Sequence, residues 1–507
     1  MPITVHAAQI IGLDAQPIAV EVDITPGLHI FSIVGLADKE IQESRERISA
    51  AIKNVGALAP HKKSQRVIVN LAPAHIRKEG PAFDLAIALG YLGASGQIRF
   101  DPKGMLFLGE LGLDGGLRSI NGILPIALAA RTHGFHTLFV PKGNGREAAI
   151  VSGITVLETA SLGEIIAHLS DQTKIPVCVL PPHTDIQESY PVDLRDISGQ
   201  ERAKRALMIA AAGGHNMLLV GPPGAGKTLL AHALPSLLPS LSFEEMLEVT
   251  KIYSVAGILP RDNAAIRTPP FRSPHHTASH TAIVGGGIHP KPGEITLAHR
   301  GVLFLDELPE FDRRVIEALR QPLETHTVHI ARANGTAVFP ARFTLIGAMN
   351  PCPCGHLGNT QKDCICTPGS ILRYKKKISG PLLDRIDLSL DVPALTYDKF
   401  DRGQQQPTDT IRARIMDARM RQKERFAAAS HLTVNSDMKL KDIKKYLVLP
   451  DTLKPMLKMA FERFRLSARG YHRVLKLART IADLENAPVI KEHHLAEALQ
   501  YRPLQEL

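Results

Sequence analysis

The chain has 507 residues, which at roughly 100 to 200 residues per domain predicts two to four domains, each able to bury a core. A hydrophobic fraction of 44% excludes disordered and fibrous proteins, and a net charge of +10 favours anionic partners. No stretch approaches about 18 consecutive apolar residues, and the first residues lack the pattern of a secretion signal. We therefore expect a soluble, cytoplasmic protein with no membrane partner.

The sequence predicts a multidomain α/β protein. Residues 1–170 alternate short apolar runs with amphipathic stretches, which is the pattern of an α/β domain, and the proline-rich, polar residues 171–194 form the predicted linker. Within residues 195–395, a helix, a buried strand, a glycine-rich turn and a second helix predict a nucleotide-binding core with a parallel sheet. Residues 396–507 turn helical and basic, so we predict a C-terminal helical lid.

The glycine-rich turn GPPGAGKT has the spacing of a phosphate-binding loop and lies between an apolar strand and a helix, as that motif requires. Its glycines let backbone N–H groups surround a phosphate at a helix N-terminus. Lys227 supplies a positive charge to the β- and γ-phosphates, and the Thr228 hydroxyl can ligate Mg²⁺. The predicted ATP-binding residues are Gly221, Pro222, Pro223, Gly224, Ala225, Gly226, Lys227, Thr228 and Leu229.

Two further apolar strands end in polar side chains. The segment GVLFLDELPEF places Asp306 where it can hold Mg²⁺ and Glu307 where it can polarise a water molecule. The segment FTLIGAMN ends in Asn350, a neutral side chain suited to orienting the attacking water. Together with the phosphate loop, these strand ends resemble the Walker A, Walker B and sensor-1 positions of AAA+ ATPases. The resemblance implies hydrolysis of ATP with Mg²⁺.

The same resemblance implies roles for three arginines. Arg385, in SGPLLDRIDL, corresponds to a finger that reaches the γ-phosphate bound by a neighbouring subunit. Arg469 corresponds to sensor 2, and Arg473, one helical turn further, is the competing choice. A structural ion pair is the alternative for each. Because a finger acting between subunits requires a head-to-tail ring, we expect a homohexamer, promoted by ATP and DNA.

Two insertions predict β-hairpins. The first, between the Walker motifs, contains GGG and PGE turns, and its His275 and His276 match no usual zinc spacing. The second has alternating strands around an Asn334-Gly335 turn. Similar hairpins line the pore in the AAA+ group of magnesium chelatases and replicative helicases. By that resemblance the expected DNA-contacting residues are Arg272, Lys291 and Arg332, although exposed basic side chains are often only solvated.

Four of the five cysteines lie close together in the loop 352–366, in NPCPCGHLGNTQKDCICTPG. Four thiolates in a short loop suit tetrahedral, structural Zn²⁺, although the usual pairs are C-x₂-C rather than C-x-C. His356 could replace one thiolate, and reduced thiols or a redox pair are the alternatives. The predicted zinc ligands are Cys352, Cys354, Cys364 and Cys366.

The segments KEGPAFDLAIALGYL and LFLGELGLDGGLRSINGILPIALAA resemble the proteolytic domain of Lon-type proteases. In those enzymes a serine and a lysine form a dyad that needs a hydroxyl nucleophile and a desolvated amine. Here the serine position is Ala82 and the lysine position is Leu124. The resemblance therefore implies the fold of residues 1–170 without proteolysis, which leaves a packing, oligomerisation or DNA-facing role.

Taken together, the dyad-free Lon-like domain, the NPCPCG string after sensor 1, and the SGPLLDRIDL and ARTIADL strings resemble the YifB/ComM family over essentially the full chain. The resemblance implies a hexameric helicase that drives branch migration of DNA junctions while transforming DNA is integrated, with single-stranded and branched DNA as partners bound independently of sequence. It also implies recombination proteins among the partners. A metal-insertion ATPase related to magnesium chelatase and a protein-remodelling ATPase are the alternatives.

The residues of the predicted lid add an independent argument for DNA. A run of basic side chains predicts contacts with a phosphate backbone, although such a run is often only a solvated helix face. The chain has no tryptophan and few aromatic residues, which favours backbone contacts without sequence readout. The basic residues are Arg412, Arg414, Arg419, Arg421, Lys423 and Arg425.

Overall fold

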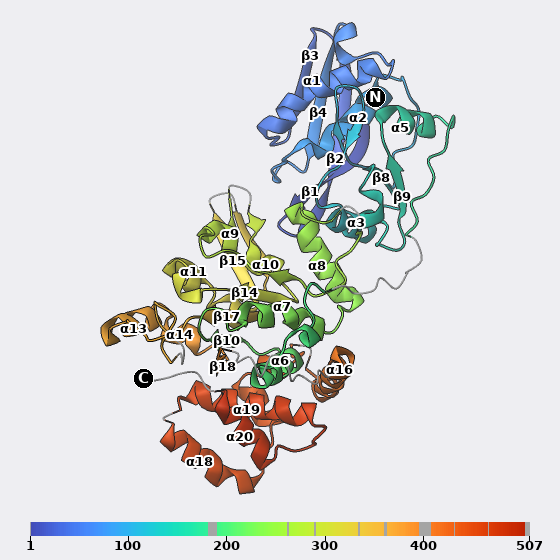
Figure 1. Ribbon diagram of the computed structural model, residues 1–507. Coiled ribbons are helices and arrows are strands. Elements are labelled where there is room, and N and C mark those ends of the chain that lie inside the picture. The colour runs from blue at the N-terminus through green and yellow to red at the C-terminus, as the bar shows by residue number, and fades with distance from the viewer. Residues whose placement is uncertain are drawn as a thin grey trace. The chain divides into compact units, whose positions relative to one another are not determined.

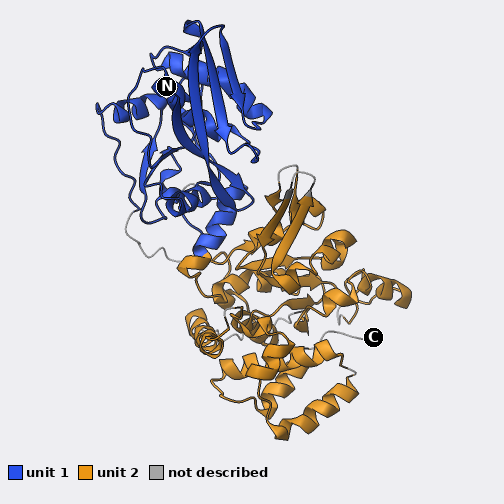
Figure 2. Ribbon diagram, turned by 180° about the vertical axis from the view of Figure 1, so that it is seen from behind, with its two compact units in different colours: residues 1–186, 246–266 blue, residues 187–245, 267–507 orange. Residues whose placement is uncertain are grey.

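The computed structural model (Figure 1) describes residues 2–180, 190–260, 263–287, 290–332, 335–358, 362–394, 407–429, 431–464 and 466–501. The chain divides into two compact units, coloured blue and orange in Figure 2. Unit 1 comprises Met1–Ile186 and Met246–Ile266, and unit 2 comprises Gln187–Glu245 and Arg267–Leu507. Residues 246–266, which the sequence analysis placed in the nucleotide-binding core, therefore belong to unit 1.

Unit 1 is built on a four-stranded sheet whose order is β1-β2-β4-β3. β3 runs parallel to β4, and the other neighbours are antiparallel. Alternate residues of β2 and β4 are buried, as expected for a sheet with one face against the core. The strands are β1 (Ile3–Ile11), β2 (Asp14–Pro26), β3 (Ile30–Val34) and β4 (Gln65–Ala72).

Two helices accompany this sheet. Helix α1 (Lys39–Asn54) begins where the Asp38 carboxylate accepts the N–H of Ile41 at 2.8 Å, a side-chain cap that stabilises the first turn. Helix α2 (Asp84–Ala94) contacts β1 and β2 and is buried from Asp84 to Leu92, because nearly all of its residues are apolar or small.

The remainder of unit 1 contains a parallel sheet of order β5-β8-β9 and a short antiparallel pair, β6 and β7. The rings of Phe107 and Phe139 stack with centroids 4.7 Å apart and fill the core between β5 and β8. The elements are β5 (Met105–Phe107), β6 (Glu110–Leu111), β7 (Leu117–Arg118), α3 (Ile123–Thr132), β8 (Thr137–Pro141), α4 (Gly145–Ala148), β9 (Thr155–Thr159) and α5 (Leu162–Leu169).

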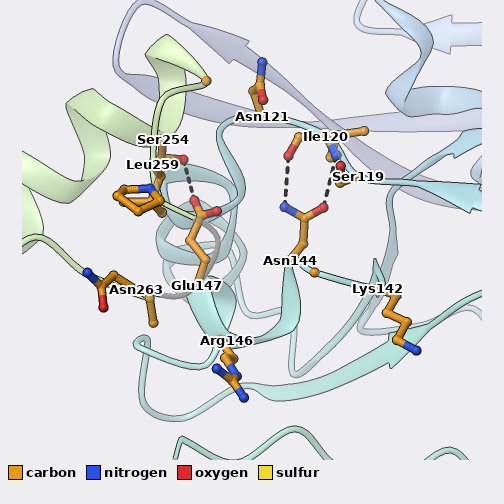
Figure 3. A pocket seen from close by; sticks show the side chains of 14 residues that line it. Ser119, Ile120, Asn121, Lys142, Asn144, Arg146, Glu147, Ser254, Leu259 and Asn263 are labelled. Carbon is orange, nitrogen blue, oxygen red and sulfur yellow. Dashed lines mark hydrogen bonds between the residues drawn. The ribbon is translucent and has the colours of Figure 1, made fainter.

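Hydrogen bonds fix residues 246–266 in unit 1. Helix α8 (Phe243–Ala256) starts in unit 2 and continues into unit 1, where the Ser254 hydroxyl donates to the buried carboxylate of Glu147 (Figure 3). The same carboxylate oxygen accepts the Leu124 N–H at 2.8 Å, and the Gly122 N–H donates to the Ser254 carbonyl at 3.1 Å. The N-terminus of α3 therefore binds this segment directly.

A cavity of about 220 Å³ lies beside this contact (Figure 3). The Asn144 side chain in its wall accepts the N–H of Ile120 at 3.0 Å and donates to the carbonyl of Ile120 at 2.9 Å. The side chains of Lys142 and Arg146 point away from the Glu147 carboxylate. The Asn144 and Glu147 side chains thus bond to other residues of the cavity wall.

Unit 2 contains a parallel sheet of order β11-β14-β17-β10-β18. Every residue of β10, β14 and β17 is buried, as expected for apolar strands with both sheet faces covered. The strands are β10 (Met217–Val220), β11 (Phe271–Arg272), β14 (Val302–Leu305), β17 (Thr344–Met349) and β18 (Leu388–Asp391). The helices of this part are α6 (Glu201–Gly213), α7 (Lys227–Leu237), α9 (His280–Val284), α10 (Glu294–Leu297), α11 (Arg313–Ala318), α12 (Pro322–Thr325), α13 (Pro368–Lys375) and α14 (Gly380–Leu383).

The two insertions differ in structure. The second forms the hairpin of β15 (Thr327–Arg332) and β16 (Gly335–Pro340), which confirms the prediction and extends away from the five-stranded sheet (Figure 1). The turn residue Asn334 lies outside the described residues. The first insertion pairs only β12 (Gly285–Gly286) with β13 (Lys291–Pro292). The expected hairpin is therefore short, because the flanking residues form the helices α9 and α10.

The C-terminal residues form the predicted helices, and α16 and α19 pack against α6. One hydrophobic cluster contains Leu207 of α6, Ile415 of α16 and Ile481 of α19, so core and lid share their buried side chains. The helices are α16 (Thr408–Arg425), α17 (Leu440–Tyr446), α18 (Lys454–Arg463), α19 (Ala468–Leu484) and α20 (Glu492–Gln500). The mixed α/β fold class is confirmed. Within the described ranges, the structure contains no helix with the length and apolar character that crossing a membrane requires.

Candidate active site

Three neighbouring strands of unit 2 bring the predicted site residues together. β14, β17 and β10 are adjacent and parallel, so their carboxyl ends meet at one edge of the sheet. Asp306 follows β14, Asn350 follows β17, and the phosphate loop follows β10. This edge is the position at which parallel α/β sheets bind ligands.

The phosphate loop has the backbone that its glycines predict. Gly224 and Gly226 have φ angles of +77° and +87°, in the left-handed region that favours glycine. A Cβ atom at either position would have open space around it for 4 Å, so the outer face of this loop is accessible. The loop ends at the N-terminus of α7, where backbone N–H groups favour a bound phosphate.

Lys227 is held at the centre of the site. Its Nζ donates to the carbonyl oxygens of Gly221 at 2.7 Å and Pro222 at 2.9 Å, and to Oδ1 of Asn350 at 3.2 Å. The side chain is only 8% exposed, and burial lowers the pKa of Lys227 while the carboxylates of Asp306 and Glu307 oppose that shift. The lysine therefore joins the phosphate loop to the sensor-1 position.

Thr228 and Asp306 form the second contact of the site. The Thr228 hydroxyl donates to Oδ2 of Asp306 at 2.8 Å, and the N–H of Glu307 donates to Oδ1 at 2.9 Å. A hydroxyl and a carboxylate are the oxygen ligands that Mg²⁺ takes beside a nucleotide. These residues fit ATP and Mg²⁺, with Thr228 and Asp306 as the metal-holding pair.

Glu307 has a contact that the sequence analysis missed. Its φ of +51° is unusual for a non-glycine residue, and its carboxylate lies 3.4 Å from Nδ1 of His276. From the sequence alone, metal binding was the one role weighed for His276. Nothing in its spacing links it to Glu307, because the sheet order brings the two together.

Comparison with known families agrees with this geometry. Residues 193–400 match the family described as magnesium chelatase, subunit ChlI. Residues 20–144 match subunit ChlI of Mg-chelatase, and residues 405–502 match the C-terminal part of that subunit.

Two relatives match over nearly their whole length. The competence protein ComM of Haemophilus influenzae is 42% identical, over 99% of this chain and 98% of that protein. The protein YifB of Escherichia coli is 41% identical, over 99% of this chain and 97% of that protein. The chain belongs to the YifB/ComM family. A partial match, 31% identical over 32% of the chain, is to Lon protease 2 of Bacillus subtilis. The protein is an AAA+ ATPase of the magnesium-chelatase-like group, with a Lon-like N-terminal region.

The positions of the lost Lon-type dyad are apolar in this YifB/ComM member. Leu124 is fully buried, and its backbone N–H is engaged by Glu147. Ala82 accepts the N–H of Gly109 through its carbonyl oxygen at 3.1 Å. Neither position offers a nucleophile or a base.

Arg385 is held inward rather than extended. Its Nη2 pairs with the carboxylate of Glu324, and its Nη1 donates to the carbonyl of Pro381 at 2.6 Å. The side chain is 15% exposed, and among the described residues no acceptor faces its buried Nε. The role implied by the family resemblance, a finger to a neighbouring subunit, requires the guanidinium to leave Glu324. That glutamate lies on α12, directly before the hairpin β15–β16.

Replacing Glu324 by glutamine is expected to raise the rate of ATP hydrolysis about twofold to fivefold, because an ion pair whose carboxylate is exposed to solvent contributes about 0.5 to 1 kcal/mol. The Arg385 guanidinium holds the pKa of Glu324 below its usual value, so the pair is charged at neutral pH. Phosphate release from the wild type and the variant at equal, high protein concentration tests this. Glu317→Gln is the control, since Glu317 pairs with Arg320 at 2.7 Å. A slower Glu324→Gln protein would contradict the proposed restraint of Arg385.

The burial of the two sensor-2 candidates differs. Arg473 is 6% exposed and donates to the carbonyl of Asp384 at 2.6 Å, with the Asp387 carboxylate 3.8 Å away. Arg469 is 62% exposed and lies 3.6 Å from the Asp384 carboxylate. Arg473 therefore ties α19 to the segment after α14, which favours Arg469 as the residue that can turn toward a nucleotide.

The expected DNA-contacting residues are not equivalent. Arg272 makes a two-point ion pair with Glu294, at 2.6 and 2.7 Å, which the sequence analysis did not anticipate. This pair engages two guanidinium nitrogens of Arg272 at the base of the first insertion, and its contact with DNA stays a prediction. Lys291 lies on β13 and is exposed. The side chain of Arg332 lies outside the described residues.

Most of the basic residues on α16 contact the protein itself. Arg419 donates twice to the carbonyl of Ala211 at the end of α6, and Arg421 donates to the carbonyl of Asp483 at 2.7 Å. Arg425 pairs with the buried Asp483 carboxylate, and Arg412 donates to the Ser240 hydroxyl at 3.1 Å. These four arginines therefore use hydrogen-bonding groups within the protein, and the phosphate contacts expected of this helix stay a prediction.

The four clustered cysteines converge on one point. The Cys352 Sγ lies 3.4 Å from that of Cys354 and 3.6 Å from that of Cys364, and no disulfide joins them. All four sulfur atoms of Cys352, Cys354, Cys364 and Cys366 lie within 4.8 Å of one another. A tetrahedron of sulfurs about 2.3 Å from zinc has edges of about 3.8 Å, so these thiols fit Zn²⁺. His356 is not part of the group.

Proposed function

We propose that the protein is a DNA motor: a homohexameric AAA+ helicase that uses ATP to promote branch migration of DNA junctions during recombination and integration of transforming DNA. The observation that carries this proposal is the similarity to a competence protein over 99% of the chain. The matched residues include both the ATPase site and the two insertions, so a DNA motor activity shared with that protein accounts for both features.

The site residues supply the steps of hydrolysis. Lys227 and the loop N–H groups bind the phosphates, and Thr228 and Asp306 hold the Mg²⁺ that neutralises their developing charge. The Glu307 carboxylate accepts a proton from the attacking water, which the Asn350 amide orients. Arg385 of one subunit completes the site of the next, which is the reason for proposing a ring.

The insertions supply the proposed contact with DNA. The hairpin β15–β16 stands out from the sheet, and Lys291 is exposed on β13. Contacts of this kind go to the phosphate backbone, so binding should be independent of sequence and weaken with salt. Recombination proteins are the expected further partners.

Branch migration on labelled three- and four-strand DNA junctions tests the proposal, with ATPase rates recorded with and without DNA. Junction resolution that needs ATP and disappears in Lys227→Ala supports a DNA motor. Intact junctions and an ATPase rate indifferent to DNA would contradict it. That result would favour a metal-insertion ATPase, which the match of residues 193–400 to magnesium chelatase subunit ChlI makes the second candidate, or a protein-remodelling ATPase.

We further propose that the four cysteines bind one structural Zn²⁺. Metal analysis of purified protein, handled under reducing conditions, is expected to return about one zinc per chain. The variant Cys364→Ser should lose most of that metal because three thiolates and a hydroxyl bind zinc more weakly. Cys178→Ser is the control, since Cys178 lies in unit 1 outside the cluster. Protein that carries no zinc when the cysteines are intact would refute this assignment.

A further inference from the structure

The cysteine loop begins at the active site. Asn350, which accepts from Lys227, is followed after one residue by Cys352. Cys352 is fully buried, and its sulfur accepts the N–H of Leu357 at 3.3 Å. The first thiol of the cluster is therefore fixed two residues from the sensor-1 side chain, so whatever fixes that thiol limits the movement of Asn350.

The same loop packs against the phosphate loop. Gly355 has a φ of +81°, and a Cβ atom placed on it would lie 2.7 Å from Cδ and 2.9 Å from Cγ of Pro223. It would also lie 3.9 Å from Cγ of Asn350. Real Cβ atoms do not come this close to another carbon, so the backbone at Gly355 rests on the phosphate loop with no room for a side chain.

The helix that follows the cysteine loop also contacts Asn350. Helix α13 follows the last cysteine, and the phenol of its Tyr374 hydrogen bonds with the backbone of Asn350. Tyr374 is 6% exposed, and burial raises the pKa of its phenol to about 12, so it stays protonated at neutral pH. Asn350 is therefore held from both ends of the segment that carries the four thiols.

We propose that the metal held by the four cysteines keeps Asn350 and Pro223 in their working positions, so that ATP hydrolysis depends on metal occupancy of a site that takes no part in the chemistry. The inference rests on the proposed Zn²⁺ site and on the ATPase activity of the family. The metal acts by closing the loop, which presses Gly355 on the phosphate loop and restrains Asn350.

The first test uses the full chain with and without metal. Zinc is removed with a zinc-selective chelator, the chelator is removed, and zinc is added back to half of the sample. We expect kcat for ATP to fall on the order of tenfold to a hundredfold without zinc, because small displacements of positioning groups have effects of this size. We also expect weaker binding of a fluorescent ATP analogue, and recovery of both on addition of zinc.

The second test changes the contact while keeping all four thiols. Gly355→Ala is expected to lower kcat and weaken binding of the analogue while about one zinc per chain stays bound. Ile365→Ala is the matched control: Ile365 lies between two of the cysteines but is 87% exposed, so this variant should hydrolyse ATP at the wild-type rate. The Gly355 variant decides the question if the zinc-free protein unfolds.

The possible failures are distinguishable. Zinc-free protein that keeps its circular dichroism spectrum and hydrolyses ATP at an unchanged rate overturns this inference and leaves the metal site and the ATPase standing. A Gly355→Ala protein with bound zinc and unchanged kinetics does the same. Absence of zinc from intact protein overturns the metal site itself, and absence of ATPase activity in the wild type overturns the proposed function.

Discussion

Replacing Lys227 by alanine is expected to reduce ATP hydrolysis at least about a hundredfold, and with it every ATP-dependent effect on DNA. The ammonium group donates to two carbonyl oxygens of the phosphate loop, and removing one preorganised electrostatic contact of this kind typically costs about a hundredfold to a thousandfold in rate. Phosphate release at saturating ATP measures the effect.

The control for this variant is Lys454→Ala, which removes a lysine that is 67% exposed on α18 of the same unit. Thermal unfolding of both variants separates a loss of catalysis from a loss of folded protein. Hydrolysis by Lys227→Ala within threefold of the wild type, in folded protein, would show that this loop is not the ATP site.

The second large effect is expected for Glu307→Gln. Loss of the proton acceptor should slow hydrolysis about a hundredfold to ten-thousandfold, the usual contribution of a general base. Binding of ATP should persist, because Lys227, Thr228 and Asp306 are unchanged. Filter binding of radiolabelled ATP, in parallel with phosphate release, should therefore show a protein that holds ATP without turning it over.

Glu310→Gln is the matched control, since Glu310 lies three residues further along the chain and pairs with Lys377 at 2.8 Å. It should leave the rate unchanged. If Glu307→Gln hydrolyses ATP as fast as the wild type, another residue polarises the water, and the contact between His276 and Glu307 has a structural role only.

The central part of the site could be predicted because its signals are local. The phosphate loop and the ends of β14 and β17 are short apolar runs followed by a few polar residues, and parallel strands bring such ends to one edge. The thiols of the cysteine cluster are also close in sequence, so their convergence followed from spacing alone. Each of these features depends on residues a few positions apart.

The contacts that sequence reasoning missed join residues far apart in the chain. No periodic pattern in the sequence predicts the ion pair of Glu324 with Arg385 or the contact of Gly355 with Pro223. The protein contacts of the arginines on α16 were missed for the same reason. Their spacing showed a basic helix, but the acceptors that engage them lie on α6 and α19, and only the fold brings these helices together.

The boundary of unit 1 was missed for a different physical reason. The sequence of α8 is an ordinary helical pattern, which carries no sign of a domain boundary. Hydrogen bonds of Ser254 attach α8 to unit 1. The partners of Ser254 are Glu147 and Gly122, which precede it in the chain by more than a hundred residues. Glu147 is 8% exposed, and this burial raises the pKa of its carboxyl group.

We expect the nucleotide-binding core of unit 2 and its C-terminal helical lid to be inherited together. Their shared cluster interlocks side chains from Leu194 to Tyr501, among them Leu207, Ile415 and Ile481. Recombination between two members of the family with a crossover near residue 400 would join faces that diverged separately, and the resulting voids and overlaps would each lower stability. Gene exchange within the family should therefore preserve the pairing of a given core with its own lid.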